Sequence, residues 1–248
     1  MIKKDKFIEF VDKYSFNNRL HSVTWKVVTE TKTLRTRGEL DSKSLTMDVT
    51  LKGFEEFGED VRIPIATTPK IKPLLLPFDD EVELKLNKMG DRILGFSISD
   101  ANCESYCAAS DISVIPPVSK SNIENATYSV QIDLSEDFVG RFLKARAALV
   151  EVDGFSIRKN KAGQVEFILG NSIPNSNRIT LLAPIKDGVD TYNGNLIRFP
   201  INNIIDLLKA NKEMPSGILS LSENNGVIKI QYSNDQFDCS YWQLAYVK

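Results

Sequence analysis

The sequence contains one histidine, His21, in 248 residues, and this scarcity excludes several kinds of catalytic site. A metal site with two histidine ligands cannot form, and a Ser/His or Cys/His catalytic pair would have to use this one residue. Its neighbours, NNRLHSVTW, predict a loop that enters a strand, which favours a surface or turn role for His21 over catalysis. The motifs GxGxxG and GxxxxGK followed by Ser or Thr are absent too, so no nucleotide site built on a glycine loop is predicted.

Cysteine is almost as scarce as histidine. The three cysteines, Cys103, Cys107 and Cys239, form no CxxC pair. An odd number without that spacing predicts reduced thiols in a cytosolic setting rather than a disulfide framework. We interpret the three residues as small core or strand residues.

Long apolar runs are also missing. No uninterrupted run approaches the ~20 residues that a membrane helix needs, and the start, MIKKDKFIEFVDKY, is amphipathic and unlike a signal sequence. The formal net charge of -2 is nearly balanced, which argues against a protein that coats nucleic acid over its whole surface and leaves room for a local basic patch. These features predict a soluble, cytoplasmic protein with no membrane contact.

Two acidic clusters, FEEFGED and PFDDEVE, are the only hint of a metal site. Either cluster could hold a divalent metal in principle. Charge runs mixed with Pro and Gly between apolar segments are more typical of solvated turns, however, so we predict no metal ligand and no cofactor.

An internal repeat is the strongest positive feature of the sequence. The segment LIRFPINN has a near copy, VRIPIATT, in which Arg62 and Pro64 lie 136 residues before Arg198 and Pro200. The same shift takes Gly90 to Gly226 and Cys103 to Cys239, while a shift near 131 takes Phe7 to Phe138. Because a strand shows one face at every second residue, the preserved parity means that matching side chains point inward in both copies. A duplication explains this better than chance.

The second copy shows the order of the elements most clearly. TYSVQIDL alternates as a strand, and Ser135 caps a helix that runs to about Leu149. Strands follow at VDGFSIRKN, QVEFILGN and RITLLAPI; LIRFP then forms a strand, a helix spans Asn202 to about Asn211, and GILSLS, GVIKIQYS and FDCSYWQLAYV form three more strands. The predicted fold class is therefore α+β, with two similar domains that each contain two strand-helix-three-strand units.

The domain limits follow from the repeat and from a polar, proline-containing segment between the copies. We place domain 1 at residues 1–110, an extended connector at 111–126 and domain 2 at 127–248. In the first copy, Pro73 should make the second helix short or kinked. Pro64 and Pro200 should occupy strand ends or sheet edges, where a missing N–H costs little.

Four strand-helix-three-strand units in one chain resemble the DNA polymerase sliding clamps. The resemblance is closest in GILSLSENNGVIKIQYSNDQFDCSYWQLAYV, which is similar to the last hairpin and closing strand of proliferating cell nuclear antigen and of the tailed-phage clamps. It implies a homotrimeric ring that encircles duplex DNA without reading its sequence, that works with a DNA polymerase and a clamp loader, and that has no catalytic activity.

In such a ring the helices would line the hole, so their cations become candidate DNA contacts. Helical geometry at about 100° per residue leaves Lys144 opposite the apolar stripe of its helix, with Arg141 to the side. The full set of candidate DNA-binding residues is Lys6, Lys13, Lys70, Lys72, Arg141, Lys144, Lys209 and Lys212. The bland alternative is that these residues only solubilise exposed helix faces, since salt screens scattered charges.

The resemblance also implies a hydrophobic pocket beside the connector for short partner peptides. The candidate walls are Val114, Ile115 and Pro116 from the connector and Trp242, Leu244 and Tyr246 from the C-terminal strand. Alternatively, Trp242 lies wholly in the core and only the terminal residues reach the pocket.

Two other functions are compatible with the sequence. A clamp-fold scaffold or regulator could bind protein partners without encircling DNA. An enzyme would rest on the acidic clusters alone, with Asp79 and Asp80 as the residues to change.

Overall fold

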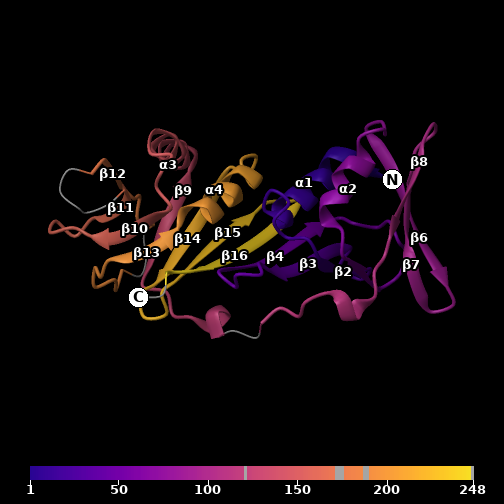
Figure 1. Cartoon of the computed structure of the whole chain (residues 1–248), viewed down its shortest axis with the longest axis horizontal. Coiled ribbons are helices and arrows are strands. Elements are labelled where there is room, and N and C mark those ends of the chain that lie inside the picture. Colours follow the sequence, from indigo (N-terminus) through magenta and orange to yellow (C-terminus); the bar gives the residue numbers. More distant parts are fainter. Residues whose placement is uncertain (120–121, 171–175, 187–189, 247–248) are drawn as a thin grey trace. The chain divides into compact units, whose positions relative to one another are not determined.

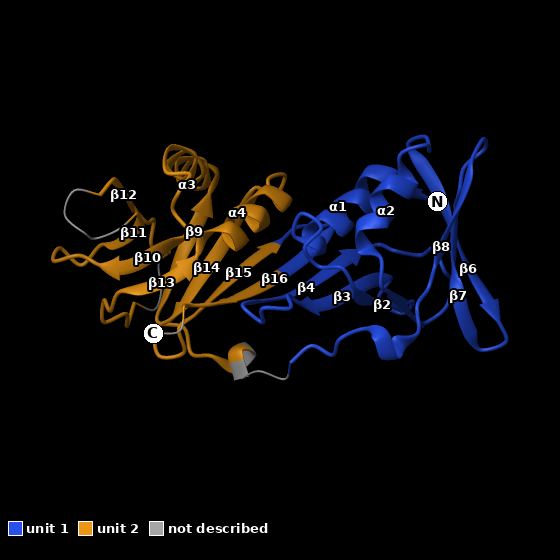
Figure 2. Cartoon of the chain, in the orientation of Figure 1, with its two compact units in different colours: residues 1–119, 233–239 blue, residues 120–232, 240–248 orange. Residues whose placement is uncertain are grey.

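The computed structural model describes residues 1–119, 122–170, 176–186 and 190–246. The chain divides into two compact units (Figure 2). Unit 1 comprises residues 1–119 and 233–239, and unit 2 comprises residues 120–232 and 240–248. Residues 120 and 121 of the expected connector lie outside the described residues.

Unit 1 contains a strand, a helix and three strands, and then the same order of elements a second time (Figure 1). Its elements are β1 (Ile2–Lys3), α1 (Lys4–Ser15), β2 (Val23–Val28), β3 (Thr33–Glu39), β4 (Leu45–Lys52), β5 (Val61–Ile65), α2 (Thr68–Leu75), β6 (Glu81–Met89), β7 (Arg92–Ser99) and β8 (Glu104–Ala108). Two short 3-10 helices, η1 (Ile112–Val114) and η2 (Asn122–Asn125), lie in the connector.

Unit 2 repeats this order of elements. Its elements are β9 (Val130–Ser135), α3 (Glu136–Ala148), β10 (Gly154–Lys159), β11 (Val165–Gly170), β12 (Arg178–Leu182), β13 (Ile197–Pro200), α4 (Ile201–Ala210), β14 (Ser216–Ser222), β15 (Val227–Ser233) and β16 (Phe237–Leu244). The last residue of β15 and the first three residues of β16 belong to unit 1. The predicted strand-helix-three-strand order is therefore confirmed in all four places.

Sheet topology shows the duplication more directly than the sequence does. The strands of unit 1 are ordered β1-β6-β7-β8 and β5-β2-β3-β4. Those of unit 2 are ordered β9-β14-β15-β16 and β13-β10-β11-β12, which are the same two orders with eight added to each strand number. Every pair with a recorded register is antiparallel. Shared topology at both levels supports one ancestral unit that was copied.

The prolines of the repeated pentad lie where the sequence predicts them. Pro200 is the last residue of β13 and Pro64 is the penultimate residue of β5. Both strands end the orders given above. The second helix of the first copy is short, as predicted, because α2 has eight residues and contains Pro73.

The core of unit 1 is built around Trp25, which is fully buried in β2. Its ring lies 5.5 Å from Phe7 and 5.9 Å from Phe10 of α1, and 5.4 Å from Phe96 of β7, measured between ring centroids. The indole Nε1 donates to the hydroxyl of Tyr14 at 3.3 Å. One side chain thus joins the helix to strands of both sheets of this unit.

The core of unit 2 uses phenylalanine instead. Phe142 of α3 packs against Phe155 at 5.4 Å and Phe167 at 6.1 Å between ring centroids, on two neighbouring strands. The predicted cap is confirmed, because the Ser135 hydroxyl accepts a hydrogen bond from the Phe138 backbone N–H. This bond fixes the start of α3 and so determines which helix face meets the sheet.

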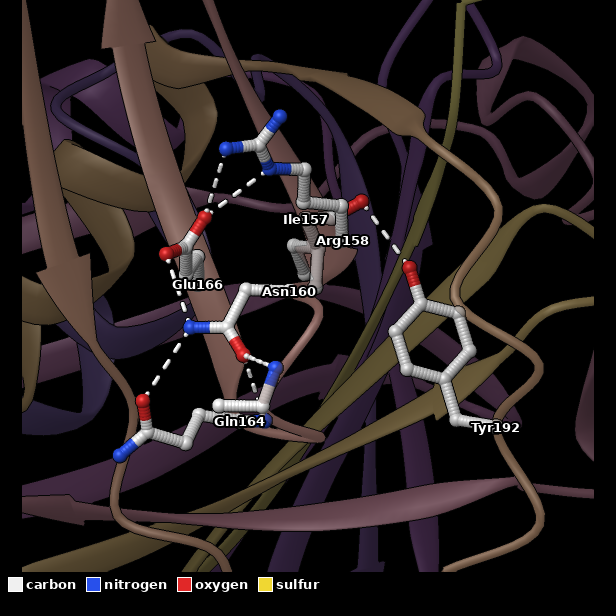
Figure 3. A network of polar contacts seen from close by, with 7 residues as sticks. Ile157, Arg158, Asn160, Gln164, Glu166 and Tyr192 are labelled. Atoms are coloured by element: carbon white, nitrogen blue, oxygen red, sulfur yellow. Dashed lines mark hydrogen bonds and ion pairs between the residues drawn. The ribbon is translucent and has the colours of Figure 1, made fainter.

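A polar network stabilises the hairpin of β10 and β11 (Figure 3). The carboxylate of Glu166 accepts from Arg158 Nε at 2.9 Å and from Asn160 Nδ2 at 3.1 Å. The hydroxyl of Tyr192 donates to the Ile157 carbonyl at 3.0 Å, which ties the segment before β13 to β10. Burial raises the pKa of the Tyr192 hydroxyl, so this donor stays protonated.

We expect Glu166→Gln to lower the free energy of unfolding by about 1 kcal/mol at pH 7. Burial raises the pKa of the Glu166 carboxyl, but hydrogen bonds from Asn160 and Arg158 outweigh it and hold the pKa below 4.5. A group with a depressed folded pKa stabilises above its unfolded pKa and loses that contribution as pH falls through the folded value. Chemical denaturation at several pH values should therefore show a difference between the two proteins that shrinks below about pH 4.

Glu151→Gln is the matched control for this prediction, because Glu151 is an exposed carboxyl of the same unit. It should change stability little at any pH. A Glu166 effect that stayed constant across the acid range would contradict the assigned role of its carboxylate.

Candidate functional site

The helices of unit 2 present two exposed cations without a partner in the described part of the chain. Lys144 lies in α3 and Lys209 in α4, and both side chains are exposed. The buried residues of α3 are Phe138, Phe142 and Ala145, which puts Lys144 away from the packed face. Both lysines are thus available to an anion approaching the helices of this unit.

Two other candidate cations, Arg141 of α3 and Lys212 just after α4, are already paired. Arg141 Nε lies 3.0 Å from the Asp137 carboxylate one helical turn earlier, and Lys212 Nζ lies 3.5 Å from Glu213. All four side chains are largely exposed, so these pairs are weak and a phosphate could compete with the carboxylates. The effective positive charge at Arg141 is nevertheless lower than the sequence alone indicates.

The helices of unit 1 offer fewer exposed candidate cations without a partner in the described residues. Lys70 of α2 is exposed and has no partner within the described residues. Lys72 pairs with Asp12 of α1 at 2.6 Å, a contact between the two helices of this unit. Lys6 is partly buried and donates to the Lys52 carbonyl at 3.0 Å, and burial lowers its pKa although Glu9 opposes this. Lys70 is therefore the clearest candidate in unit 1.

Lys13 requires a correction. The sequence predicts it beside the polar face of the first helix, but its side chain is 0% exposed. Its Nζ lies 4.8 Å from the centroid of the Phe237 ring, which residues 233–239 bring into unit 1. A lysine can bury its stem and place its charge over an aromatic face, so its position on a helical wheel does not determine its exposure.

The connector side of the predicted partner pocket lies in unit 1. Val114 is exposed at the end of η1, Ile115 is half-buried and Pro116 is exposed. Ile115 and Pro116 line a cavity of about 830 Å³ against the sheet of the same unit. The connector thus has apolar side chains beside an open space.

The C-terminal side of the predicted pocket lies in unit 2. Trp242 is buried, and Lys229 Nζ lies 5.4 Å from the centroid of its ring. Leu244 is half-buried, and the 41% exposed Tyr246 packs against Arg198 and donates to the Asp153 carbonyl. The alternative in which Trp242 belongs to the core is therefore correct, and Leu244 and Tyr246 remain the candidates at this end.

A cluster of cations on the sheet of unit 1 was not predicted from the sequence. Lys26, Arg35, Arg37 and Arg62 line the same cavity as the connector residues. The alternation in TWKVV, TLRTRG and VRIPI puts each of them at a solvent-facing strand position. What the sequence does not reveal is the pairing of these strands, and the pairing is what brings the cations together.

Comparisons with known proteins bear on the fold. No protein-family model matches the sequence, and no curated protein matches it either. The structure is similar to a crystal structure of proliferating cellular nuclear antigen from Entamoeba histolytica, with a TM-score of 0.71, 14% sequence identity, and coverage of 99% of this chain and 96% of that chain. This chain has the DNA clamp fold. The α+β class predicted from the sequence is thereby confirmed, while the tailed-phage type of clamp stays a prediction.

The sequence also raised a few possible catalytic or metal-binding groups. In the described residues, no three His, Cys, Asp or Glu side chains gather as metal ligands. Asp79 and Asp80 are exposed at the turn before β6, and His21 is exposed in a loop. Cys103 and Cys107 are free thiols, and burial raises the pKa of the Cys107 thiol to about 11. Among the described helices, none has the length and hydropathy to cross a membrane.

Proposed function

We propose that this chain is the subunit of a DNA polymerase sliding clamp, which closes with two further copies into a ring around duplex DNA. The observation that carries the proposal is the clamp fold over 99% of the chain. Exposed lysines on α2, α3 and α4 that have no partner among the described residues support it. A ring holds DNA by topology, so its contacts with phosphates can be few, independent of sequence and weak enough for sliding.

In this proposal the chain is not an enzyme. It tethers the replicative polymerase and is placed on DNA by a loader, in the cytoplasm of the cell or of an infected host. The similarity of the last hairpin to the tailed-phage clamps favours a phage origin. Short apolar segments of these partners would bind at the connector, at Val114, Ile115 and Pro116, and at Leu244 and Tyr246.

Molar mass in solution provides the first test. Light scattering at micromolar concentration should give three times the 27.9 kDa of one chain. A stable monomer at that concentration would count heavily against a ring.

Retention on DNA provides the second test. Loaded onto a nicked circular plasmid, the protein should remain bound in high salt and should slide off after the plasmid is cut once, because only encirclement survives screening of the phosphate contacts. Equal loss from circular and linear DNA would remove the topological part of the proposal.

A clamp-fold scaffold that binds proteins without encircling DNA is the second candidate. It is favoured by one observation: of the eight candidate DNA cations, Lys13 is buried, while Lys72, Arg141 and Lys212 are paired. A monomer that binds partner peptides but is not retained on circular DNA would identify this function.

A further inference from the structure

Three cations stand side by side across three neighbouring strands of unit 1. The recorded register pairs Arg62 of β5 with Lys26 of β2, and Lys26 with Arg35 of β3. Their side chains therefore share one face of the sheet, with Cβ atoms of neighbours about 5 Å apart. The next residues along β2, Trp25 and Val27, are buried, so this cation row lies on the face opposite the α1 core. We use "cation row" for Arg62, Lys26 and Arg35.

Such a row opposes folding, because like charges directly opposite one another on a sheet are destabilising. Asp48 of β4 pairs with Arg35 and offsets part of the repulsion. Among the described residues, neither Lys26 nor Arg62 has an ion pair. The residues that line the cavity include the whole row and a fourth cation, Arg37, and contain no carboxylate. The residues that line the cavity therefore carry only positive charge, with the Asp48 carboxylate beside Arg35 as a nearby counter-charge.

The duplicated unit shows that the fold does not need the row. In unit 2 the equivalent positions are Arg198 of β13, Ser156 of β10 and Ile168 of β11, which the register pairs in the same way. Arg198 is neutralised there by Asp153 and packs against the Tyr246 ring. The three equivalent sheet positions of unit 2 thus hold a single cation, and that cation is paired. The cation row of unit 1 is therefore not required by the fold, and the repulsion between its charges lowers stability.

The connector covers this face with apolar side chains. The cavity has a volume of about 830 Å³, with the cations on the sheet side and Ile112, Ile115 and Val118 on the connector side. A smaller cavity of about 280 Å³ shares Arg62, Pro64 and Ile112 with it and adds Arg92 together with the carboxylate of Asp111. Together they form one groove with a cationic floor, an apolar wall and a single carboxylate at the Arg92 end.

We propose that this groove binds an extended acidic segment of a partner protein, with Asp or Glu side chains on the cation row and apolar side chains against the connector. The proposal specifies the chemistry of a partner segment at the connector in the proposed function, and it does not rest on encirclement of DNA. A bidentate guanidinium–carboxylate pair with Arg62 would orient the segment, while the guanidinium of Arg35 is already bound by Asp48 and adds charge beside it.

The lining favours a peptide over a nucleic acid. Sites for single-stranded nucleic acid usually stack bases on aromatic side chains, and the larger cavity has only Thr, Lys, Arg, Pro, Ile and Val in its walls. Aliphatic and proline side chains instead suit the apolar residues of a peptide.

The test is fluorescence anisotropy without DNA, using a fluorescein-labelled peptide in which Asp and Glu alternate with Leu. The wild-type chain should bind it, and added salt should weaken the complex. Lys26→Gln/Arg62→Gln should raise the Kd about tenfold, because two charge-assisted contacts are lost. The control, Lys85→Gln/Lys161→Gln, removes two exposed lysines elsewhere and should leave the Kd unchanged.

Several results would overturn the proposal: no binding of the acidic peptide, equal Kd values for the two double variants, or equal binding of a peptide with Lys in place of the acidic residues. If oligo(dT) displaces the acidic peptide and binds more tightly than the peptide does, the groove is a nucleic-acid site instead. The Lys26/Arg62 variant should melt at or above the melting temperature of the wild type. A loss of binding in that variant is then not caused by unfolding. The Lys26→Gln/Arg62→Gln variant should be retained on circular DNA as well as the wild type. Failure of the peptide-binding proposal can therefore be told apart from failure of the ring proposal.

Discussion

A chain in which Lys70, Lys144 and Lys209 are all replaced by glutamate should support processive synthesis at least about tenfold less well than the wild type. These are the exposed helix cations without partners in the described residues, one on each of α2, α3 and α4. In the proposed ring, reversal of their charge would turn three phosphate attractions into repulsions in every subunit. Primer extension with the cognate polymerase and loader measures the effect.

The matched control for that experiment reverses three exposed lysines away from the helices, Lys85, Lys161 and Lys186. It imposes the same change in net charge, so a general electrostatic effect would appear in both variants. Unchanged processivity in the helix variant, with normal folding, would support the scaffold function instead. The triple change avoids Arg141, whose charge is already shared with Asp137.

The second large effect concerns stability. Trp25→Ala should lower the free energy of unfolding by about 3–5 kcal/mol, the usual cost of removing a large aromatic side chain from a core. The loss has three parts: the contacts with Phe7 and Phe10, the contact with Phe96, and the hydrogen bond to Tyr14. Urea denaturation followed by far-ultraviolet circular dichroism measures it.

Trp25→Phe separates these contributions, because it keeps a ring in the core and removes the indole N–H. It should cost less than the alanine variant. A loss below about 1 kcal/mol for Trp25→Ala would show that the α1 core of unit 1 does not depend on this side chain.

The order of the elements was predictable because local signals agreed with the repeat. Ser135 followed by acidic residues marks the start of α3, and the structure has the helix there. Pro73 predicts a short second helix, and α2 has eight residues. Each of these local signals, the helix cap and the proline, acts over one or two helical turns. The repeat then settles the type and order of the elements that such local signals leave ambiguous.

The exposure of individual side chains was less predictable. Lys13 occupies a plausible polar position on the wheel of α1, but its burial depends on Phe237, which lies more than two hundred residues later. For the same reason, the sequence does not decide whether Trp242 lies in the core or lines the pocket. Such contacts depend on tertiary packing, which the period of one element does not encode.

The cation row shows a third limit. Lys26, Arg35 and Arg62 each follow the alternation of their own strands, which the sequence reveals. Their adjacency depends on register, and a slip of one residue in any pair would send a side chain to the other face. Register between strands is fixed by packing of both faces, so a single sequence does not determine it.

Residues 233–239 have a consequence for how the protein is made. They belong to unit 1, where Phe237 is fully buried and Lys52 pairs with Asp238 at 2.8 Å. Domains made on the ribosome generally fold in the order in which they emerge, starting from the N-terminus. Here the unit that is synthesised first needs a segment that follows residues 120–232 of unit 2, so unit 1 completes its packing only after most of unit 2 has been synthesised.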